Sequence, residues 1–489
     1  MDTIPEPTIL LKLAASNGLI EIAREHLNAR LAAKYGSPLV IRETKKGRTV
    51  KLNSMMIAAI LAEEMLLAYD PSLSIFYSYN EREGTWTGVT EAILKYRFDD
   101  LIRKIAILLG VSKDELVPLC EDRKLSSLVS IIKGRVESPD IFEKKRAAVH
   151  VGNGMLLWEK GGFTLTEYHP IYYSRNRCAI NFEPDAECPE FMEFLTWAVP
   201  DPEDRSTLQL LMGQWLLGVN LMQKIVVFRG KAGSGKSTLM AIFREIVGRQ
   251  NTCELRTAHL NERFEINNYF RKSLLLGSDV KEDFLCNGGA DALKKLTGDD
   301  VITLEAKYAA KVREILGNFN IGITTNNYLR IGLGSDADAW KRRLFIVDFL
   351  SRLYGKNRIG YATALVKIEG KGILRWMVEG AAQLFIHIDR QEELPMSLNQ
   401  IARVNEVIGE NESLTQFIAE KVIPGAGDIT TSEIVEAYQQ YCSEKNWKPL
   451  LNPDRYIKQL ISQNHNINQR HDINRNGNDV RGYNNLTLK

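Results

Sequence analysis

The stretch KIVVFRGKAGSGKSTLMAIFREIVG, residues 224–248, joins a short apolar run, a glycine-rich turn and a helical pattern. The β-branched residues 225–227 predict a buried strand, and apolar side chains recur at helical spacing after Thr238. Residues 230–237 between them match G-x-x-x-x-G-K-[ST], in which backbone N–H groups turn toward an anion. The stretch therefore predicts an α/β domain with a phosphate site at the strand-to-helix turn.

The residue types of this turn favour ATP as the ligand and Mg²⁺ as its companion. The Lys236 ammonium can reach the β and γ phosphate oxygens, and the Ser237 hydroxyl can hold magnesium. The alternative is a glycine-rich turn with a surface lysine and no ligand. The predicted ATP-binding residues are Gly230, Gly233, Ser234, Gly235, Lys236, Ser237 and Thr238.

Two later strands end on polar residues that ATP hydrolysis could use. Asp279 follows SLLLGS and is the predicted partner of magnesium and of the attacking water, with Glu282 as a nearby alternative. Asn326 follows NIGITT and could orient that water. Arg342 and Arg343 precede the apolar run LFIVDF, and either could stabilise charge in the transition state, although such a pair is more often a solvated basic patch.

Four motifs in this order resemble those of superfamily III helicases, in the branch of phage, plasmid and poxvirus primase-helicases. The motifs are residues 230–237, Asp279, ITTNN (323–327) and AWKRRLFIVDF (339–349), with a hairpin-like stretch at 296–311. NGMLLWEKGGFTLTEYHP, LMGQWLLG and GILRWMVEGAAQL extend the resemblance to about residues 75–390. The sequence departs from the family in having Gly277-Ser278-Asp279 where relatives often carry glutamate, and Asn327-Tyr328 where proline is common.

The resemblance implies a hexamer-like ring with ATP bound between neighbouring copies. Lys236 and Ser237 would hold phosphates, Asp279 would serve magnesium and water, and Asn326 would sense the γ-phosphate. Arg342 or Arg343 would complete the neighbour's site. Lys307 matches the family's channel lysine, and a hairpin that also carries Lys311 would suit contact with the DNA backbone.

The chain as a whole predicts a multidomain α/β protein whose P-loop core is AAA+-like, with an α+β N-terminal domain and a C-terminal winged helix. Residues 42–48 form a basic stretch, RETKKGR, to which no role is assigned. The predicted domains are a helical leader (1–73), an α+β middle domain (74–200), the ATPase core (201–350), a helical segment with a linker (351–424) and a winged-helix-like domain (425–489).

The C-terminal region is locally basic. Six lysines and arginines against three aspartates lie between residues 452 and 489, an excess of three positive charges. This charge permits contact with DNA without requiring it, and a protein-docking wing is a comparable alternative. The candidate DNA-binding residues are Arg455, Lys458, Arg470, Arg475 and Arg481.

Composition narrows the other possibilities. The formal net charge is only +2, so binding to nucleic acid must depend on local clusters. The six cysteines are scattered, no apolar run reaches the length of a membrane span, and no signal peptide is evident, which favours a cytoplasmic protein without membrane contact. We also expect no zinc site, and no primase or nickase in the first 75 residues.

The favoured function is an ATP-dependent replicative DNA helicase of a mobile genetic element. One alternative is a P-loop ATPase that loads or remodels replication proteins on DNA without unwinding it. Another is a DNA-binding regulator whose assembly ATP controls. The expected partners are single-stranded or forked DNA, further copies of the chain and possibly a separate primase or initiator protein.

Overall fold

The computed structural model describes two compact units. The first unit comprises Met1–Arg146 and Glu167–Arg175, and the second comprises Ala147–Thr166 and Asn176–Lys489. None of the helices in the described part of the chain is long and apolar enough to cross a lipid bilayer. The description covers all residues except 1–28, 45–46, 72, 140–141, 143–147, 160, 282–288, 305–312, 327–328, 330–336, 351–358, 446, 448, 451–452 and 476.

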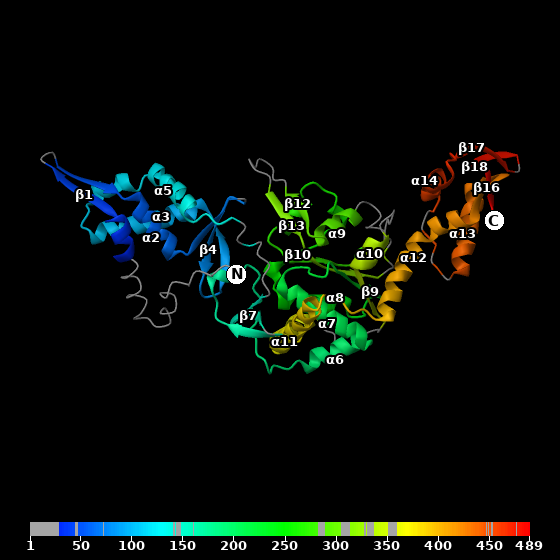
Figure 1. The fold of residues 1–489 in the computed structure, drawn as a ribbon, viewed down its shortest axis with the longest axis horizontal. Coiled ribbons are helices and arrows are strands. Elements are labelled where there is room, and N and C mark those ends of the chain that lie inside the picture. The colour runs from blue at the N-terminus through cyan, green and yellow to red at the C-terminus, as the bar shows by residue number, and fades with distance from the viewer. Residues whose placement is uncertain are drawn as a thin grey trace. The chain divides into compact units, whose positions relative to one another are not determined.

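In unit 1, helices α2, α3 and α5 pack against an antiparallel sheet of order β3-β4-β5 (Figure 1). Polar side chains start the helices: Asn53 caps α2, Thr90 caps α3, and Ser112 with Glu115 forms a capping box on α4. The elements are β1 Leu39–Thr44, β2 Gly47–Leu52, α2 Ser54–Glu64, β3 Leu67–Asp70, β4 Ile75–Asn80, β5 Thr85–Val89, α3 Glu91–Leu108, α4 Lys113–Leu116 and α5 Asp122–Arg135.

The N-terminal region differs from the predicted helical leader. β1 and β2 pair as an antiparallel hairpin from Leu39↔Leu52 to Thr44↔Gly47, and β3 pairs with β4 across the predicted boundary at residue 74. One core buries side chains of α2, α3 and α5 together, which is why no domain ends there. The many lysines and arginines of the hairpin obscure the alternation of apolar and polar residues that would have predicted two strands.

The predicted middle domain, residues 74–200, is divided between the two units. A three-stranded meander, β6 Ala148–Val151, β7 Gly154–Glu159 and β8 Gly162–Thr166, lies in unit 2. The chain then returns to unit 1, where the Trp86 indole donates a 2.9 Å hydrogen bond to the Pro170 carbonyl. Such long-range packing leaves no local signal in the sequence.

Unit 2 is built around a parallel sheet of order β10-β11-β14-β9-β15. The strands are β9 Ile225–Gly230, β10 Thr252–Glu254, β11 Leu274–Gly277, β14 Asn320–Thr325 and β15 Leu344–Phe349. Their near-continuous apolar sequences match burial on both faces, as expected for parallel strands. β12 Asp300–Leu304 and β13 Arg313–Gly317 form a separate antiparallel hairpin.

Helices cover both faces of this sheet. Val226 and Phe228 face a core shared with α6, α7, α8 and α11, whereas Ile225 and Val227 face one shared with α9, α10 and α12. α7, α8 and α11 lie side by side in Figure 1. These helices are α6 Pro189–Ala198, α7 Pro202–Leu217, α8 Lys236–Val247, α9 Gly289–Thr297, α10 Ala337–Arg343, α11 Tyr361–Asp389 and α12 Leu398–Lys421.

The C-terminal region of unit 2 has its own small core. The end of α12, with Leu414 and Phe417, packs with α13 and α14 against an antiparallel sheet of order β16-β18-β17. Residues 424–428 lie within β16, so the domain boundary predicted after residue 424 falls inside a strand, where a register shift between Pro424 and Asp428 accommodates the proline. The elements are β16 Val422–Thr430, α13 Thr431–Glu444, α14 Asp454–His465, β17 Arg470–Arg475 and β18 Asn478–Leu488.

Candidate functional site

The loop between β9 and α8 brings its backbone close to neighbouring groups. Gly235 precedes α8 with a φ of 95°, and a Cβ there would lie 2.9 Å from the Trp197 ring. A Cβ on Gly230 would overlap the Phe349 carbonyl oxygen. Glycine is therefore required at both positions. No described side chain caps α8, so the N–H groups of its first turn remain available to an anion.

Lys236, the first residue of α8, is held inside this loop. Its ammonium donates to the carbonyls of Gly230 at 2.6 Å and Lys231 at 2.9 Å, and to Asn326 Oδ1 at 3.0 Å. Burial lowers the pKa of Lys236, and the nearby Asp279 carboxylate opposes that shift. The cation is therefore partly stripped of water and contacts neutral acceptors, for which phosphate oxygens would be stronger replacements.

Asp279 and Asn326 meet at the same edge of the sheet as Lys236. Asn326 follows β14, the neighbour of β9, and its amide lies 3.4 Å from Asp279 Oδ1. Asp279 follows β11 in a left-handed conformation, φ 45°, and its backbone N–H donates to Thr324 Oγ1 at 2.9 Å. Lys236, Asn326 and Asp279 thus form one contact chain at the carboxyl ends of parallel strands, where ligands commonly bind in such sheets.

In the first turn of α8 Ser237 is exposed and Thr238 is half-buried, while Ser234 is buried in the loop. Glu282, the alternative acid, lies outside the described residues. The site therefore has a described carboxylate, Asp279, and a described hydroxyl, Ser237. Among the described residues no group of three or more His, Cys, Asp or Glu side chains is arranged to hold a metal ion.

Arg342 and Arg343 lie at the amino ends of the parallel strands, at the end of the sheet opposite Lys236. They end α10 just before β15, where Leu344 pairs with Ile225, the first residue of β9. The glycine loop follows the last residue of β9, about 16 Å further along the strand. Arg342 is exposed, whereas Arg343 is buried and donates to the Ala339 carbonyl at 3.1 Å. Arg342 is therefore turned to solvent and far from the Lys236 of its own chain.

The structure describes the strands on both sides of the two predicted DNA-contact lysines but not the lysines themselves. Lys307 and Lys311 lie outside the described residues, between β12 and β13, whose register runs to Leu304↔Arg313. The hairpin predicted from the sequence is thus present up to its tip.

Acidic neighbours hold two of the five predicted C-terminal cations. Arg475 forms bonds of 3.0 and 3.1 Å to the Glu433 carboxylate, and Arg470 pairs with Asp472 at 2.8 Å. Lys458 on α14 and Arg481 on β18 are exposed, and Arg455 lies on α14 with its side chain outside the description. The local excess of positive charge is therefore partly balanced within the module.

Sequence reasoning missed an ion pair beside the glycine loop. Arg229, one residue before Gly230, contacts both carboxylate oxygens of Asp348 at 2.6 and 2.9 Å, and it lies 3.8 Å from Glu406 on α12. The pair ties β9 to β15 directly below the loop. A charged residue inside the otherwise apolar strand IVVFRG was the available signal.

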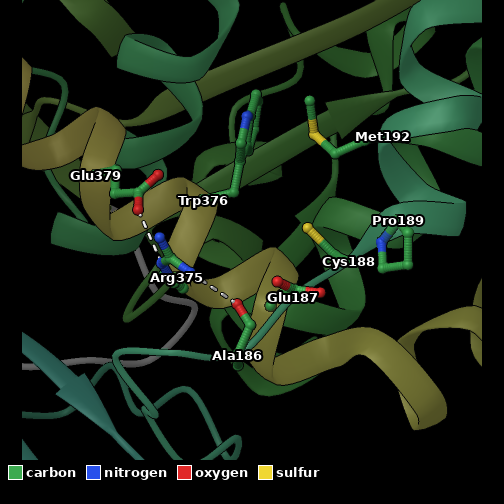
Figure 2. Close-up of a pocket in the computed structure, with 9 residues that line it drawn as sticks. Ala186, Glu187, Cys188, Pro189, Met192, Arg375, Trp376 and Glu379 are labelled. Atoms are coloured by element: carbon green, nitrogen blue, oxygen red, sulfur yellow. Dashed lines mark hydrogen bonds and ion pairs between the residues drawn. The ribbon is translucent and has the colours of Figure 1, made fainter.

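A cavity of about 280 Å³ lies elsewhere in unit 2, where the start of α6 meets α11, and Figure 2 shows the residues that line it. Arg375 crosses its wall, bonded to Glu379 at 2.9 Å and to the Ala186 carbonyl at 3.3 Å, while Cys188 and Trp376 contribute apolar surface. None of the predicted site residues lines this cavity. It is separate from the glycine loop.

Two parts of the chain match protein-family models. Residues 54–200 match the model described as D5 N terminal like, and residues 228–343 match a family of unknown function, DUF5906. The first match relates this part of the chain to D5 N terminal like proteins. The second runs from β9 to α10 and includes Lys236, Asp279, Asn326 and both arginines. Comparison with curated proteins gave no match.

The chain is also similar to solved apo structures of the C-terminal region of NrS-1. One is 13% identical, with 88% of this chain and 98% of that chain covered at a TM-score of 0.44. Another is 14% identical, with 89% and 100% covered at a TM-score of 0.45. Scores this low add nothing to the fold described above.

Proposed function

We propose that this protein is an ATP-dependent replicative DNA helicase of a mobile genetic element and that its copies form a ring, hexameric by family resemblance, around DNA. The observation that carries the proposal is the convergence of Lys236, Asn326 and Asp279 beside a glycine loop and an uncapped helix start. Helix N-termini and lysine ammonium groups together bind phosphates. The match of residues 54–200 to D5 N terminal like proteins supports a role in replication.

The described groups fit ATP and Mg²⁺. The backbone N–H groups at the start of α8 and the Lys236 ammonium would hold the phosphates. Gly230 and Gly235 let the loop pack closely against Phe349 and Trp197, and Gly233 adopts a positive φ of 80° that favours glycine. Ser237 and Asp279 would hold Mg²⁺, which neutralises phosphate charge when it is bound.

Asn326, Asp279 and Lys236 would have separate roles in ATP hydrolysis. Asn326 already contacts both Lys236 and Asp279, so its amide would orient a water molecule against the γ-phosphate. Asp279 would accept a hydrogen bond from that water. Charge that develops on the phosphate would be stabilised by Lys236 and by an arginine from a neighbouring copy.

Arg342 is the better candidate for that neighbouring arginine. It is exposed and lies at the sheet edge opposite its own Lys236, a position from which it can serve another copy and not its own site. Arg343 is buried on α10 and donates to Ala339, which indicates a structural role. Lys307, Lys311 and the terminal cations would contact DNA phosphates.

The first test measures ATP hydrolysis and unwinding of forked DNA at one salt concentration. Lys236→Ala should reduce hydrolysis about 100-fold or more, as loss of a transition-state charge contact does. Lys231→Ala removes an exposed lysine from the same loop and should retain activity. Hydrolysis that depends on Lys236, without strand separation on either polarity, would favour a loader or remodeller of replication proteins.

A mixing experiment tests the ring. Arg342→Ala keeps an intact loop, and Lys236→Ala keeps an intact Arg342, so each protein alone should be inactive. Mixed copies would place an intact loop beside an intact arginine and regain part of the activity. If the mixture stays inactive while both proteins assemble with ATP and Mg²⁺, the trans role of Arg342 is wrong.

A further inference from the structure

The hairpin of β1 and β2 has two chemically different faces. Residues paired directly across antiparallel strands point to the same side, so the register assigns every described side chain to a face. The inner face carries the pairs Leu39↔Leu52 and Ile41↔Val50. Leu39 is buried in the core of unit 1 and Val50 and Leu52 pack against that core, whereas Ile41 is exposed. The outward face consists of Val40↔Lys51 and Arg42↔Thr49.

The outward face is positively charged and exposed. Arg42, Thr49 and Lys51 are all exposed, and the described outward face contains no acidic side chain. The only acid in the hairpin sequence, Glu43, is on the inner face opposite Arg48. Lys45 and Lys46 stand between the two strands in the sequence and lie outside the described residues.

Arg48 fixes the far end of this hairpin. It lies 3.6 Å from Glu115 on α4 and donates to the Gly110 carbonyl at 3.3 Å. The hairpin is therefore attached to unit 1 both at its base, through Leu39, and near its tip. A surface held in this way loses little conformational entropy when it binds a partner.

We propose that the outward face of the β1–β2 hairpin binds the phosphate backbone of duplex DNA. Arg42 and Lys51 lie on neighbouring pairs of this face, roughly 7 Å apart along the strands, which is close to the rise of two nucleotides. A two-stranded ribbon is also narrow enough for the major groove. The interaction would be independent of ATP and would add a duplex contact outside the nucleotide-binding unit.

Other partners fit this surface less well. Single strands are usually bound on aromatic side chains that stack with bases, and the described outward face has none. A membrane surface requires a broad apolar face, whereas Val40 is the one apolar residue among those four. Charge without stacking or apolar area favours phosphates held in a rigid duplex.

The test uses the full chain without nucleotide and a fluorescent duplex of about 20 base pairs, with affinity measured over a range of salt concentrations. Arg42→Gln/Lys51→Gln should lower the slope of log affinity against log salt by about 1.8, since each phosphate contact contributes about 0.9. At about 0.15 M salt this corresponds to an affinity loss of up to about 30-fold.

The control pair Arg103→Gln/Lys104→Gln removes the same charge from exposed positions on α3 in the same unit. It should leave the slope unchanged, and thermal unfolding should show that both double variants are folded. The proposal is overturned if the hairpin variant keeps the wild-type slope or if the control loses as much. It is also overturned if the loss is as large for single-stranded DNA, or is seen with anionic vesicles instead of the duplex.

This outcome is separable from the helicase proposal, because Lys236→Ala protein should bind the duplex as the wild type does. Duplex binding that is unchanged in Lys236→Ala and weakened, with the lower salt slope, in Arg42→Gln/Lys51→Gln would establish the hairpin site even if no unwinding is found.

Discussion

Replacing Lys224 by methionine should stabilise the protein at pH 7. Lys224 precedes β9 and is only 9% exposed, and within the described residues its ammonium contacts the Met396 sulfur at 3.5 Å. Burial lowers the pKa of Lys224 to about 8, the nearby Arg342 adds to this shift, and Glu393 opposes it. The folded protein therefore carries a poorly solvated positive charge.

The size of the effect follows from the displaced pKa. The pKa falls from 10.5 to about 8, and each unit corresponds to about 1.4 kcal/mol, so the charge costs about 3 kcal/mol at neutral pH. Between pH 8 and 10.5 the folded state loses this proton while the unfolded chain keeps it, so stability should rise with pH across that window. Lys224→Met removes this cost at pH 7, and the stability of the variant should not rise between pH 8 and 10.5 as that of the wild type does.

Urea unfolding followed by tryptophan fluorescence measures this, since Trp215 and Trp340 are buried in unit 2. The stability advantage of Lys224→Met over wild type should be about 3 kcal/mol at pH 7 and should vanish near pH 10.5. Lys367→Met, at an exposed position of α11, should match wild type throughout. A Lys224→Met protein less stable than wild type at pH 7 would refute the reasoning, because the ammonium would then have a strong favourable partner.

Three further predictions concern packing and charge. Gln214→Leu should cost about 2–5 kcal/mol in urea unfolding, because it breaks three hydrogen bonds of 2.8–3.0 Å, two of them buried, including those to Asn320 Oδ1 and from the Met222 N–H. Gly213→Ala should sharply reduce the yield of folded protein, because its Cβ would overlap the Ala381 nitrogen where α7 meets α11. Arg475 holds the pKa of Glu433 at about 2. Stability from that exposed pair, about 1 kcal/mol, should therefore be lost as pH falls from about 4.5 to 2, which comparison with Glu433→Gln would reveal.

The contact chain of the candidate site follows from local patterns and one general rule. Lys236 could be found from the glycine pattern, and Asp279 and Asn326 from their positions after apolar strands. Parallel strands end at one edge, so the three side chains could be expected to meet. Strand order could not be predicted, because it depends on long-range packing. That order places β14 between β11 and β9, which is why Asn326 bridges Lys236 and Asp279.

Burial and ion pairing separated residues that the sequence made equivalent. Arg342 and Arg343 are adjacent and chemically identical, yet only Arg343 turns into the protein. Likewise, the structure pairs Arg475, a predicted DNA contact, with Glu433, 42 residues earlier in the chain, whereas Lys458 and Arg481 are exposed. Such distinctions arise from tertiary packing and therefore have no counterpart in local residue patterns.

The path of the chain between the two units limits how this architecture can be rearranged. The chain passes from one unit to the other at residues 146–147, 166–167 and 175–176. Trp86 of the first unit donates a hydrogen bond to Pro170, which belongs to the same unit but follows the second of these crossings. A fragment ending at residue 146 would lose that carbonyl, and one beginning at residue 176 would lose the β6–β8 meander. Transfer of the first unit to another replication protein would thus require three compatible junctions, so in evolution the two units should be inherited together rather than shuffled as independent modules.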